Sequence, residues 1–256
     1  MDSKKILILA ATDEELADLR RAAGAGAPET GTVPFHRGRI GPFEAVLAAT
    51  GAGKASAAFA AGWLLARGEY RLLVNVGCAA AFPGTPLVPG DVVIADREIL
   101  ADEGASSTGG LLDLGTIGAP AIAGRPPVHN EVPIQPPCRI APKALADLSR
   151  DLGFPVRAGP LCTVSTGSGT DVLAAERFAR WRPVAESMEG AALALAALRA
   201  SIPFLEVRGI SNFTGDRDPA HRDVPRASAR AAAVALRIIE RSSDCHPPWS
   251  GAPHGS

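Results

Sequence analysis

Apolar residues in this 256-residue chain fall in short continuous runs that alternate with segments of helical period. Runs of the first kind indicate buried strands, and apolar residues three and four positions apart indicate amphipathic helices. The expected strands are 5–10, 33–40, 43–50, 71–77, 91–100, 157–166 and 203–211, and the expected helices are 13–22, 53–68, 141–153, 171–181, 188–202 and 223–242. This alternation predicts an α/β fold: a single domain with a mixed, mostly parallel central sheet flanked by helices.

Two stretches depart from the alternation. Residues 104–138 are dense in glycine and proline and keep neither period, which predicts a long loop or insertion of the kind that often carries function. Residues 243–256 combine Pro, Gly, Ser and His without apolar periodicity, which predicts a disordered C-terminal tail. The folded domain is therefore expected to span residues 1–242.

Composition and charge exclude several classes of protein. A hydrophobic content of 46% and a charged content of 21% suit a compact domain, and a formal net charge of -1 gives no electrostatic footprint for nucleic acid or an anionic membrane. The first apolar run has six residues, too short for a signal peptide or a membrane span, so a cytoplasmic protein is expected. The four cysteines form no CxxC pair and no cluster with histidine, which predicts buried thiols and no metal.

The segment "TGAGKAS" from Thr50 to Ser56 resembles a phosphate-binding loop only superficially. Ala55 follows Gly53-Lys54 where Ser or Thr is required, and Ala48 occupies the position of the first required glycine. We therefore expect a tight strand-to-helix turn, and no nucleotide-triphosphate site.

Two glutamates stand where a strand meets a helix or where a helix starts among apolar residues. Glu15 follows the first strand in "ATDEEL", either as a helix-dipole acid or as a general base in a cleft. Glu189 lies among the small apolar residues of "ESMEGAALALAAL", either as a dipole acid or as a partner for a vicinal diol. In either role the Glu189 carboxylate must be paired or hydrogen bonded, because a bare one would cost several kcal/mol.

The strand "EVRGISNF" carries a guanidinium and an amide four residues apart. Strict alternation sends Arg208, Ile210 and Asn212 to one side, so Arg208 and Asn212 are expected to share a cleft. The structural alternatives are an ion pair for Arg208 and a turn cap for Asn212.

Taken together, "ILAATDEEL", "VNVGCAA", "VPGDVVIAD", "SMEGAALA" and "PFLEVRGISN" resemble the nucleoside phosphorylase and nucleosidase superfamily, in family order from residue 5 to 241. Within it, "DEGAS", "LCTVSTGSGTD" and "ISNFTGDRD" are similar to the futalosine hydrolases, which release hypoxanthine from futalosine in a menaquinone pathway. The resemblance implies an enzyme without a cofactor that uses a small-molecule nucleoside and water, and a homo-oligomer.

The resemblance also implies roles for individual residues. Glu15 matches the glutamate that activates water, Arg208 the arginine that helps to hold it, and Glu189 the acid that binds the ribose hydroxyls. Met188 matches the residue packed against the sugar, and Cys78 and Ser211 fall among the substrate-binding positions, with Cys78 where methylthioadenosine nucleosidases have a serine.

Two further positions concern the nucleophile and the base. Asn75 stands where the phosphorylases carry a phosphate-binding arginine, which favours hydrolysis over phosphorolysis. Asn212 stands where adenine-releasing enzymes have an aspartic acid, and an amide that donates two N–H groups suits the acceptors N7 and O6 of hypoxanthine.

Three matters stay open at this stage. The substrate can instead be another purine nucleoside such as inosine, aminofutalosine or methylthioadenosine, and a catalytically silent nucleoside-binding protein is also compatible with the fold. The resemblance implies that a neighbouring subunit closes the 5' pocket. Residues 104–138 either help to bind the carboxylated 5' extension of futalosine, with Arg125 or His129 as the cation, or carry these two cations as solvated surface groups.

Overall fold

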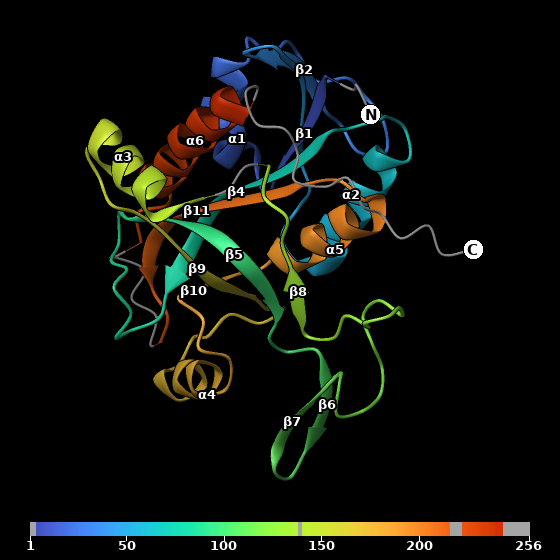
Figure 1. Ribbon diagram of the computed structural model, residues 1–256, viewed down its shortest axis with the longest axis vertical. Helices are drawn as coiled ribbons and strands as arrows, with labels where there is room; N and C mark the ends of the chain where they lie inside the picture. The colour runs from blue at the N-terminus through green and yellow to red at the C-terminus, as the bar shows by residue number, and fades with distance from the viewer. Residues whose placement is uncertain (1–3, 138–139, 216–221, 243–256) are drawn as a thin grey trace.

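The computed structural model describes residues 4–137, 140–215 and 222–242 (Figure 1). Its helices are α1 (Asp13–Ala22), α2 (Lys54–Leu65), α3 (Pro142–Leu152), α4 (Asp171–Trp181), α5 (Gly190–Ala200) and α6 (Val224–Arg241). Its strands are β1 (Lys5–Ala10), β2 (His36–Ile40), β3 (Phe43–Ala49), β4 (Leu72–Ala81), β5 (Val92–Leu100), β6 (Gly104–Ser107), β7 (Gly110–Asp113), β8 (Glu131–Pro133), β9 (Val156–Thr163), β10 (Ala185–Ser187) and β11 (Phe204–Phe213). The tail predicted over residues 243–256 lies outside the described residues and stays a prediction.

Among the described residues, nine strands form one mixed sheet. The order is β10-β9-β5-β11-β4-β1-β3-β2, with β8 beside β5. Parallel pairing joins β1 to β3 and β4, β11 to β4, and β9 to β5 and β10. Antiparallel pairing joins β2 to β3, β5 to β8 and β11, and β10 to β4. The predicted fold class, a mixed and mostly parallel sheet flanked by helices, is confirmed.

One short strand closes part of this sheet into a ring. Strand β10 runs parallel to β9, with Ala185 beside Leu161, and antiparallel to β4, with Ala185 opposite Ala81. The strands β4, β11, β5, β9 and β10 therefore form a closed circuit of hydrogen bonds. Strand β10 is bonded on both sides, so the residues that follow it enter α5 from a fixed position.

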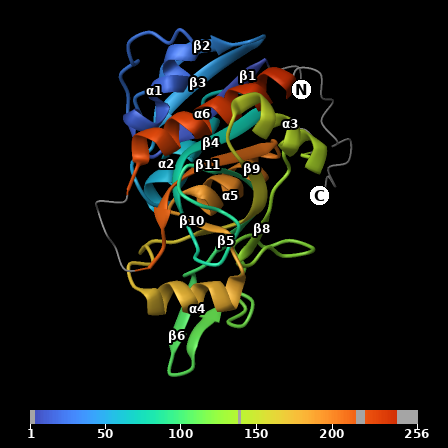
Figure 2. The same cartoon turned by 90° about the vertical axis from the view of Figure 1, so that its left-hand side faces the viewer.

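Helices cover both faces of the sheet (Figures 1 and 2). Residues of α1, α3 and α6 pack with Ile6, Val74 and Val207 in one apolar cluster, and α2 and α5 pack with Leu7 and Leu73 in another. Small residues allow close approach: a Cβ on Gly209 would collide with the Ala227 carbonyl at the start of α6. The abundance of alanine in α2 and α5 serves the same close packing.

Residues 104–137, the described part of the predicted loop, contain more regular structure than the sequence predicted. Strands β6 and β7 form a hairpin that projects from the body below β8, and β8 joins the edge of β5 (Figure 1). Arg180 of α4 binds Asp113 of β7 at 2.8 Å and ties the hairpin to the body. The hairpin strands have four residues each and lie mostly in solvent, so no buried face imposes an apolar alternation on them.

Candidate active site

A cavity of about 540 Å³ opens at the carboxyl ends of the sheet strands. Strands β4, β10 and β11 and the start of α1 supply most of its lining. The lining includes the seven residues expected to act in catalysis or to contact the sugar and base: Glu15, Cys78, Met188, Glu189, Arg208, Ser211 and Asn212. Residues far apart in the chain meet here because parallel strands end at the same edge of the sheet.

Glu15 is fixed by the first turn of α1 and by β4. It is the third residue of the helix and forms a capping box with Thr12, whose backbone N–H donates to Oε2 at 3.2 Å. Its Oε1 accepts from the backbone N–H of Cys78 at 2.9 Å. The residue is buried but lines the cavity, so its carboxylate is held in one orientation while it remains open to a small molecule.

Gly77 leaves the space in which Glu15 and Arg208 approach each other. Its φ is +153°, and a Cβ there would lie 2.6 Å from Glu15 Oε1 and 2.7 Å from Arg208 Nη1. A side chain at this position would therefore separate the carboxylate from the guanidinium or displace both.

Arg208 binds the Glu189 carboxylate on the cavity side and the buried Glu206 carboxylate on the opposite side. Its Nη2 donates to Glu189 Oε2 at 3.2 Å, and its Nε donates to Glu206 Oε1 at 2.8 Å. Burial by itself disfavours the charge, but the three glutamates around the guanidinium outweigh burial and raise its pKa further. Arg208 is thus cationic at every working pH. The ion pair that the sequence left open for it exists, and the same side chain lines the cavity.

Glu189 is the N-cap of α5 and joins two other elements. Its Oε1 accepts from the backbone N–H of Gly53 at 3.0 Å, and its Oε2 accepts from Arg208. The expectation that this carboxylate must be paired and hydrogen bonded is confirmed. Gly53 has a φ of +92° at the start of α2, so "TGAGKAS" is the predicted tight turn, and it supplies Glu189 with a donor.

The end of β11 departs from strict alternation. Its register against β4 shifts between Ile210 and Asn212, so Ser211 and Asn212 both line the cavity. Ile210 is buried in an apolar cluster instead. The prediction that Arg208 and Asn212 share a cleft is confirmed, but the regular alternation used to reach it is wrong because of this bulge.

The Asn212 amide is oriented by its neighbours. Its Oδ1 accepts from the Ser211 hydroxyl at 2.7 Å, and its Nδ2 donates one N–H to the Phe213 carbonyl at 2.7 Å. An amide nitrogen carries two N–H groups, so a second donor remains for a ligand.

Cys78 is a partly buried thiol beside Glu15. Burial raises its pKa, and the negative charge of Glu15 raises it further. Cys78 is therefore a neutral thiol that can donate to the Glu15 carboxylate. Cys162 is buried, as predicted for the thiols, whereas Cys138 and Cys245 lie outside the described residues.

Sequence reasoning missed several residues of the site. Glu186 and Arg222 line the cavity, and Glu186 accepts from the Ser168 backbone N–H at 2.7 Å and pairs with Arg177 at 3.0 Å. A signal for Glu186 existed in "AESMEG", three residues before Glu189. For Arg222 there was none, since it lies in a polar stretch without periodicity.

Residues 104–137 contribute nothing to the described lining of the cavity within one chain. Arg125 and His129 therefore do not face this cavity from within the same chain. Their predicted role in binding a 5' extension would have to come from a neighbouring subunit.

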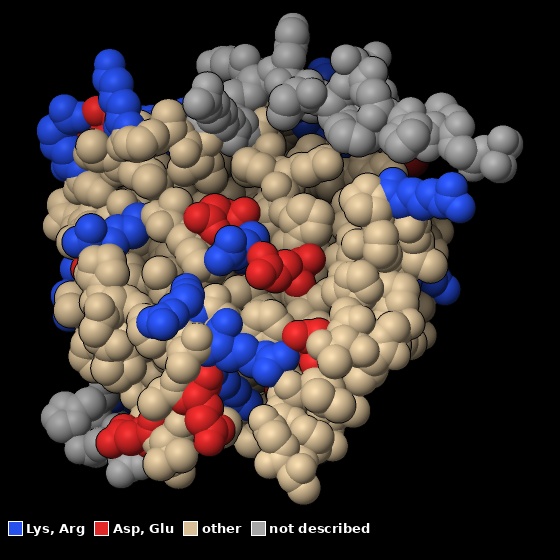
Figure 3. Space-filling view, turned by 60° about the horizontal axis from the view of Figure 1, so that its bottom comes forward, with Lys and Arg blue, Asp and Glu red and all other residues tan. Residues whose placement is uncertain are grey.

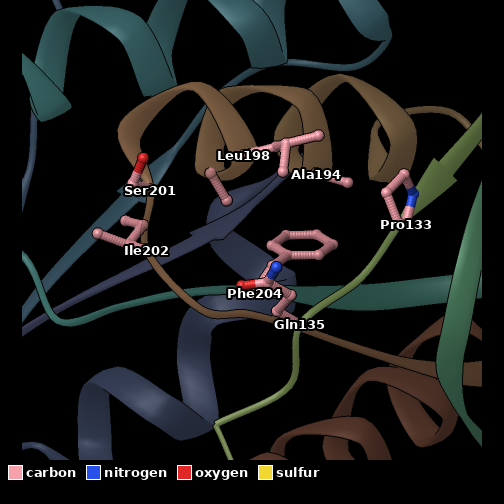
Figure 4. Close-up of a pocket in the computed structure, with 8 residues that line it drawn as sticks. Pro133, Gln135, Ala194, Leu198, Ser201, Ile202 and Phe204 are labelled. Carbon is pink, nitrogen blue, oxygen red and sulfur yellow. The ribbon is translucent and has the colours of Figure 1, made fainter. Parts of the chain in front are cut away.

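The second cavity of the described structure lacks the charged lining of the first. A second cavity of about 70 Å³ lies between α5, β8 and the start of β11, and its described lining has no charged side chain (Figure 4). On the face shown in Figure 3, basic and acidic side chains lie next to one another. Within residues 4–137, 140–215 and 222–242 there is no group of His, Cys, Asp and Glu that could hold a metal ion. Over the same residues, no helix is long and apolar enough to cross a membrane.

The fold and the cavity define a class of protein, an α/β enzyme that binds a small polar ligand beside paired carboxylates at the strand ends. Residues 5–242 match the family model described as the phosphorylase superfamily. The chain belongs to this superfamily, as its sequence motifs predicted.

Relatives within the superfamily are named for hydrolysis. The chain is 34% identical over 201 residues to the futalosine hydrolase of Thermus thermophilus. The aligned region covers 78% of this chain and 83% of that protein. It is 28% identical over 216 residues to the 5'-methylthioadenosine/S-adenosylhomocysteine nucleosidase of Colwellia psychrerythraea. This alignment covers 83% of this chain and 85% of that protein. These relatives confirm the predicted enzyme class, an N-glycosyl hydrolase of the nucleosidase type.

A solved structure supports the fold. The S-adenosylhomocysteine nucleosidase of Streptococcus pyogenes, in complex with 5-methylthiotubericidin, superposes with a TM-score of 0.76 at 25% identity. The similarity covers 94% of this chain and 98% of that chain.

Proposed function

We propose that this nucleosidase hydrolyses the N-ribosidic bond of futalosine in the cytoplasm, releasing hypoxanthine and dehypoxanthine futalosine for menaquinone biosynthesis. The observation that carries the proposal is the set of groups in one cavity: Glu189 paired with Arg208, Glu15 across Gly77 from the same guanidinium, and the neutral amide of Asn212 a short distance along β11.

Glu15 is the general base of the proposed reaction. Breaking an N-ribosidic bond develops positive charge on the sugar, and a water aimed by a carboxylate completes the substitution. The Cys78 N–H and the Thr12 N–H each donate to one Glu15 oxygen, and each oxygen keeps a lone pair for the water. The Arg208 guanidinium lies on the other side of Gly77 from this carboxylate.

Glu189 binds the ribose hydroxyls, and Met188 packs beside the sugar. Arg208 and Gly53 hold the Glu189 carboxylate and leave it facing the cavity, where a vicinal diol can donate two hydrogen bonds. A diol held in this way is oriented before the bond breaks.

Asn212 reads the base. Hypoxanthine presents the acceptors O6 and N7 on one edge, and a carboxylate there would repel both. The N–H of Asn212 that is not bonded to Phe213 can donate to one of them and stabilise the negative charge that the departing purine develops. The Ser211 hydroxyl occupies Oδ1 of Asn212, which keeps the nitrogen side available to the base.

The burial and hydrogen bonding of Asn75 favour hydrolysis over phosphorolysis. This residue is fully buried, and its Nδ2 donates to Glu206 at 3.1 Å rather than facing the cavity. Where the phosphorylases bind phosphate with an arginine, this chain offers a neutral amide that is already engaged.

Arg222 supports a substrate with an anionic 5' extension. Together with Arg208 it is a cation of the described cavity lining, and unlike Arg208 it is exposed to solvent. We expect Arg222→Ala to raise the KM for futalosine and to leave the KM for inosine unchanged, since inosine lacks the carboxylate. If Arg222→Ala leaves both KM values unchanged while Arg125→Ala or His129→Ala raises that of futalosine, the segment 104–138 binds the carboxylate instead.

The test of the activity is to mix the protein with futalosine, inosine or methylthioadenosine, with and without phosphate, and to measure the free base by chromatography. We expect hypoxanthine from futalosine, at a rate independent of phosphate. Release of adenine alone would contradict the proposal, and no release from any of the three would indicate a silent nucleoside-binding protein.

Methylthioadenosine is the second candidate substrate, because nucleosidases of that name match this chain along most of its length.

We expect Asn212→Asp to lose activity on futalosine and to shift the ratio of the two kcat/KM values toward the 6-amino analogue of futalosine. A wild type that already prefers the amino compound, or an unchanged ratio in the variant, would show that Asn212 does not read the base.

The homo-oligomer that the sequence resemblance implies belongs to the same proposal. Sedimentation velocity over a range of protein concentrations tests it directly. A monomer at all concentrations would also remove residues 104–138 from any role at a neighbouring site.

A further inference from the structure

Two glutamates that the proposed mechanism does not use lie behind Arg208. Glu98 of β5 and Glu206 of β11 are both 0% exposed. Glu206 Oε1 accepts from Arg208 Nε at 2.8 Å and from Asn75 Nδ2 at 3.1 Å. Glu98 Oε2 accepts from the Thr163 hydroxyl at 2.6 Å. A fully buried carboxylate is costly, and two of them side by side need an explanation.

The two carboxyl groups meet beneath the first turn of α5. A Cβ on Gly190 would lie 2.6 Å from Glu206 Oε1 and 2.6 Å from Glu98 Cδ, so both groups converge on the same point. The Glu98 and Glu206 carboxyls therefore lie side by side beneath Gly190. Gly190 is therefore the residue whose missing side chain makes room for the pair.

The hydrogen-bond count shows that two carboxylates cannot account for this contact. If both groups are ionised, Glu98 Oε1 and Glu206 Oε2 have no donor among the described residues. Each buried oxygen without a donor destabilises the fold, and the two charges repel each other in addition. One proton between these two oxygens satisfies both.

The surrounding groups show which residue holds the proton. Thr163 Oγ1 accepts from the Ala191 N–H at 2.7 Å, so its own hydrogen goes to Glu98 Oε2. That leaves Glu98 Oε1 as the protonated oxygen, facing Glu206. Glu206 in turn keeps its charge, because Arg208 and Asn75 both donate to its Oε1.

The charges that face the pair favour one proton on it. From β11 the pair faces the Arg208 guanidinium. Arg208 also forms an ion pair with Glu189 at the start of α5, and the charge of Glu15 of α1 lies nearby. The neutral groups are Asn75 of β4 and, on β9, Thr163 with the adjacent Cys162 thiol, whose pKa is raised by burial and by the neighbouring Glu186 carboxylate. Four carboxylates beside one cation would leave an excess of negative charge, and one proton reduces that excess.

We propose that Glu98 and Glu206 form a carboxylic acid–carboxylate pair, with one shared proton held on Glu98, that positions Arg208 for the reaction in the cavity. Glu98 donates from Oε1 to Glu206 Oε2, and this fixes the Glu206 carboxylate. Glu206 Oε1 then holds Arg208 Nε, which leaves the two terminal nitrogens for the cavity side. Both glutamates are positioning residues, since neither lines the cavity.

The direction of the Glu98 pKa agrees with this geometry. Burial raises the pKa of Glu98 well above its ordinary value of 4.5, and the neighbouring Glu206 raises it further. Thr163 and Arg208 lower it, by less than the first two effects raise it. The role assigned to Arg208 rests on the proposed function, whereas the shared proton does not.

The kinetic test compares three variants on whichever nucleoside the wild type hydrolyses. We expect Glu206→Gln to lower kcat about ten- to a hundredfold with a smaller change in KM, since Arg208 loses a charge-assisted hydrogen bond. We expect Glu98→Ala to lower kcat as well, and Glu98→Gln to restore it, because a glutamine N–H replaces the acid O–H. If Glu98→Gln loses as much kcat as Glu206→Gln, Glu98 acts through its charge and the proposal is wrong.

The spectroscopic test needs no substrate and therefore separates this proposal from the proposed function. We expect the infrared spectrum of the folded wild type at neutral pH to contain the C=O stretch of a buried protonated carboxyl, and Glu98→Gln to remove it. Asp102→Asn is the matched control: burial opposes ionisation of Asp102, but the hydrogen bonds from Lys54 and the Ser165 N–H lower its pKa, so this variant should leave the band intact. Absence of the band in wild type, or its persistence in Glu98→Gln, would overturn the shared proton.

Discussion

Arg208 connects the two halves of the proposed chemistry, because one guanidinium pairs with Glu189, the proposed ribose ligand, and lies across Gly77 from Glu15, the proposed base. A lysine could neutralise one of these carboxylates, but it could not present several N–H groups in fixed directions. Each of the two carboxylates can therefore be tested separately against the same fixed cation.

Glu15→Gln tests the general base. The amide has the shape of the carboxylate but cannot take a proton from water, so we expect nearly unchanged substrate binding and a kcat lower by about 10² to 10⁴. Steady-state kinetics and isothermal titration measure the two effects. The matched control is Glu14→Gln, an exposed acid of the same helical turn, which should leave kcat unchanged. Near-normal turnover in Glu15→Gln would show that the residue is only a helix-dipole acid.

Glu189→Gln tests the ribose contact. We expect the preference for ribosyl over 2'-deoxyribosyl substrates to fall by about 1 to 3 kcal/mol, because a charge-assisted hydrogen bond to the 2'-hydroxyl is lost. The measurement is the ratio of kcat/KM for the two substrates in variant and wild type. An unchanged ratio would leave Glu189 with a structural role at the start of α5.

At the scale of elements, the capping box of α1 couples helix stability to the orientation of Glu15. Thr12 Oγ1 accepts from the Glu15 N–H at 3.3 Å, and Thr170 caps α4 in the same way through the Leu173 N–H. We expect Thr12→Ala and Thr170→Ala each to lower the free energy of unfolding by about 1 kcal/mol. Only Thr12→Ala should also lower kcat, because it loosens the turn that holds the base. Equal kcat values in the two variants would contradict this coupling.

Most elements were predictable because their apolar period is long and their ends carry recognisable residues. The helix predicted over residues 13–22 has those bounds, and α3 ends at Gly153 with a φ of +74°. Strand β10 was missed because three residues cannot show a period, and it is held by its bonds to β4 and β9 instead. The bulge in β11 is likewise set by the neighbouring strand rather than by its own sequence.

Part of the candidate site could also be predicted from the pattern of apolar and polar residues. Residues at strand ends and helix starts could be found because a polar side chain interrupts an apolar run there, as at Glu15 and Glu189. Glu98 and Glu206 interrupt strands in the same way in "DVVIADREIL" and "PFLEVRGIS". Their meaning depends on β5 and β11 being neighbours in the sheet, which no local pattern reveals.

At the scale of the whole molecule, the Glu98 proton makes stability depend on pH. The folded chain keeps this proton at pH values where the unfolded chain has released it, because burial raises the pKa of Glu98 above 4.5. The stabilisation is complete below that ordinary value and is lost as pH rises toward the folded-state pKa, by up to about 1.4 kcal/mol per pH unit.

Glu98→Gln should flatten this dependence. We expect the variant to gain stability relative to wild type as pH rises from about 5 to about 8, and urea unfolding at several pH values measures it. Parallel curves for the two proteins would mean that Glu98 has the same pKa in both states.

Strand β11 is the last strand of the described chain, yet it lies in the middle of the sheet between β4 and β5. A ribosome that adds about 5 to 20 residues per second needs roughly ten to forty seconds to travel from Glu15 to Arg208. During that time β4 and β5 each have an edge that only β11 can fill, and such edges invite association with other chains. A nascent chain that stops before β11 therefore has neither a complete sheet nor the guanidinium, so premature termination yields an inactive, aggregation-prone fragment rather than a partly active nucleosidase.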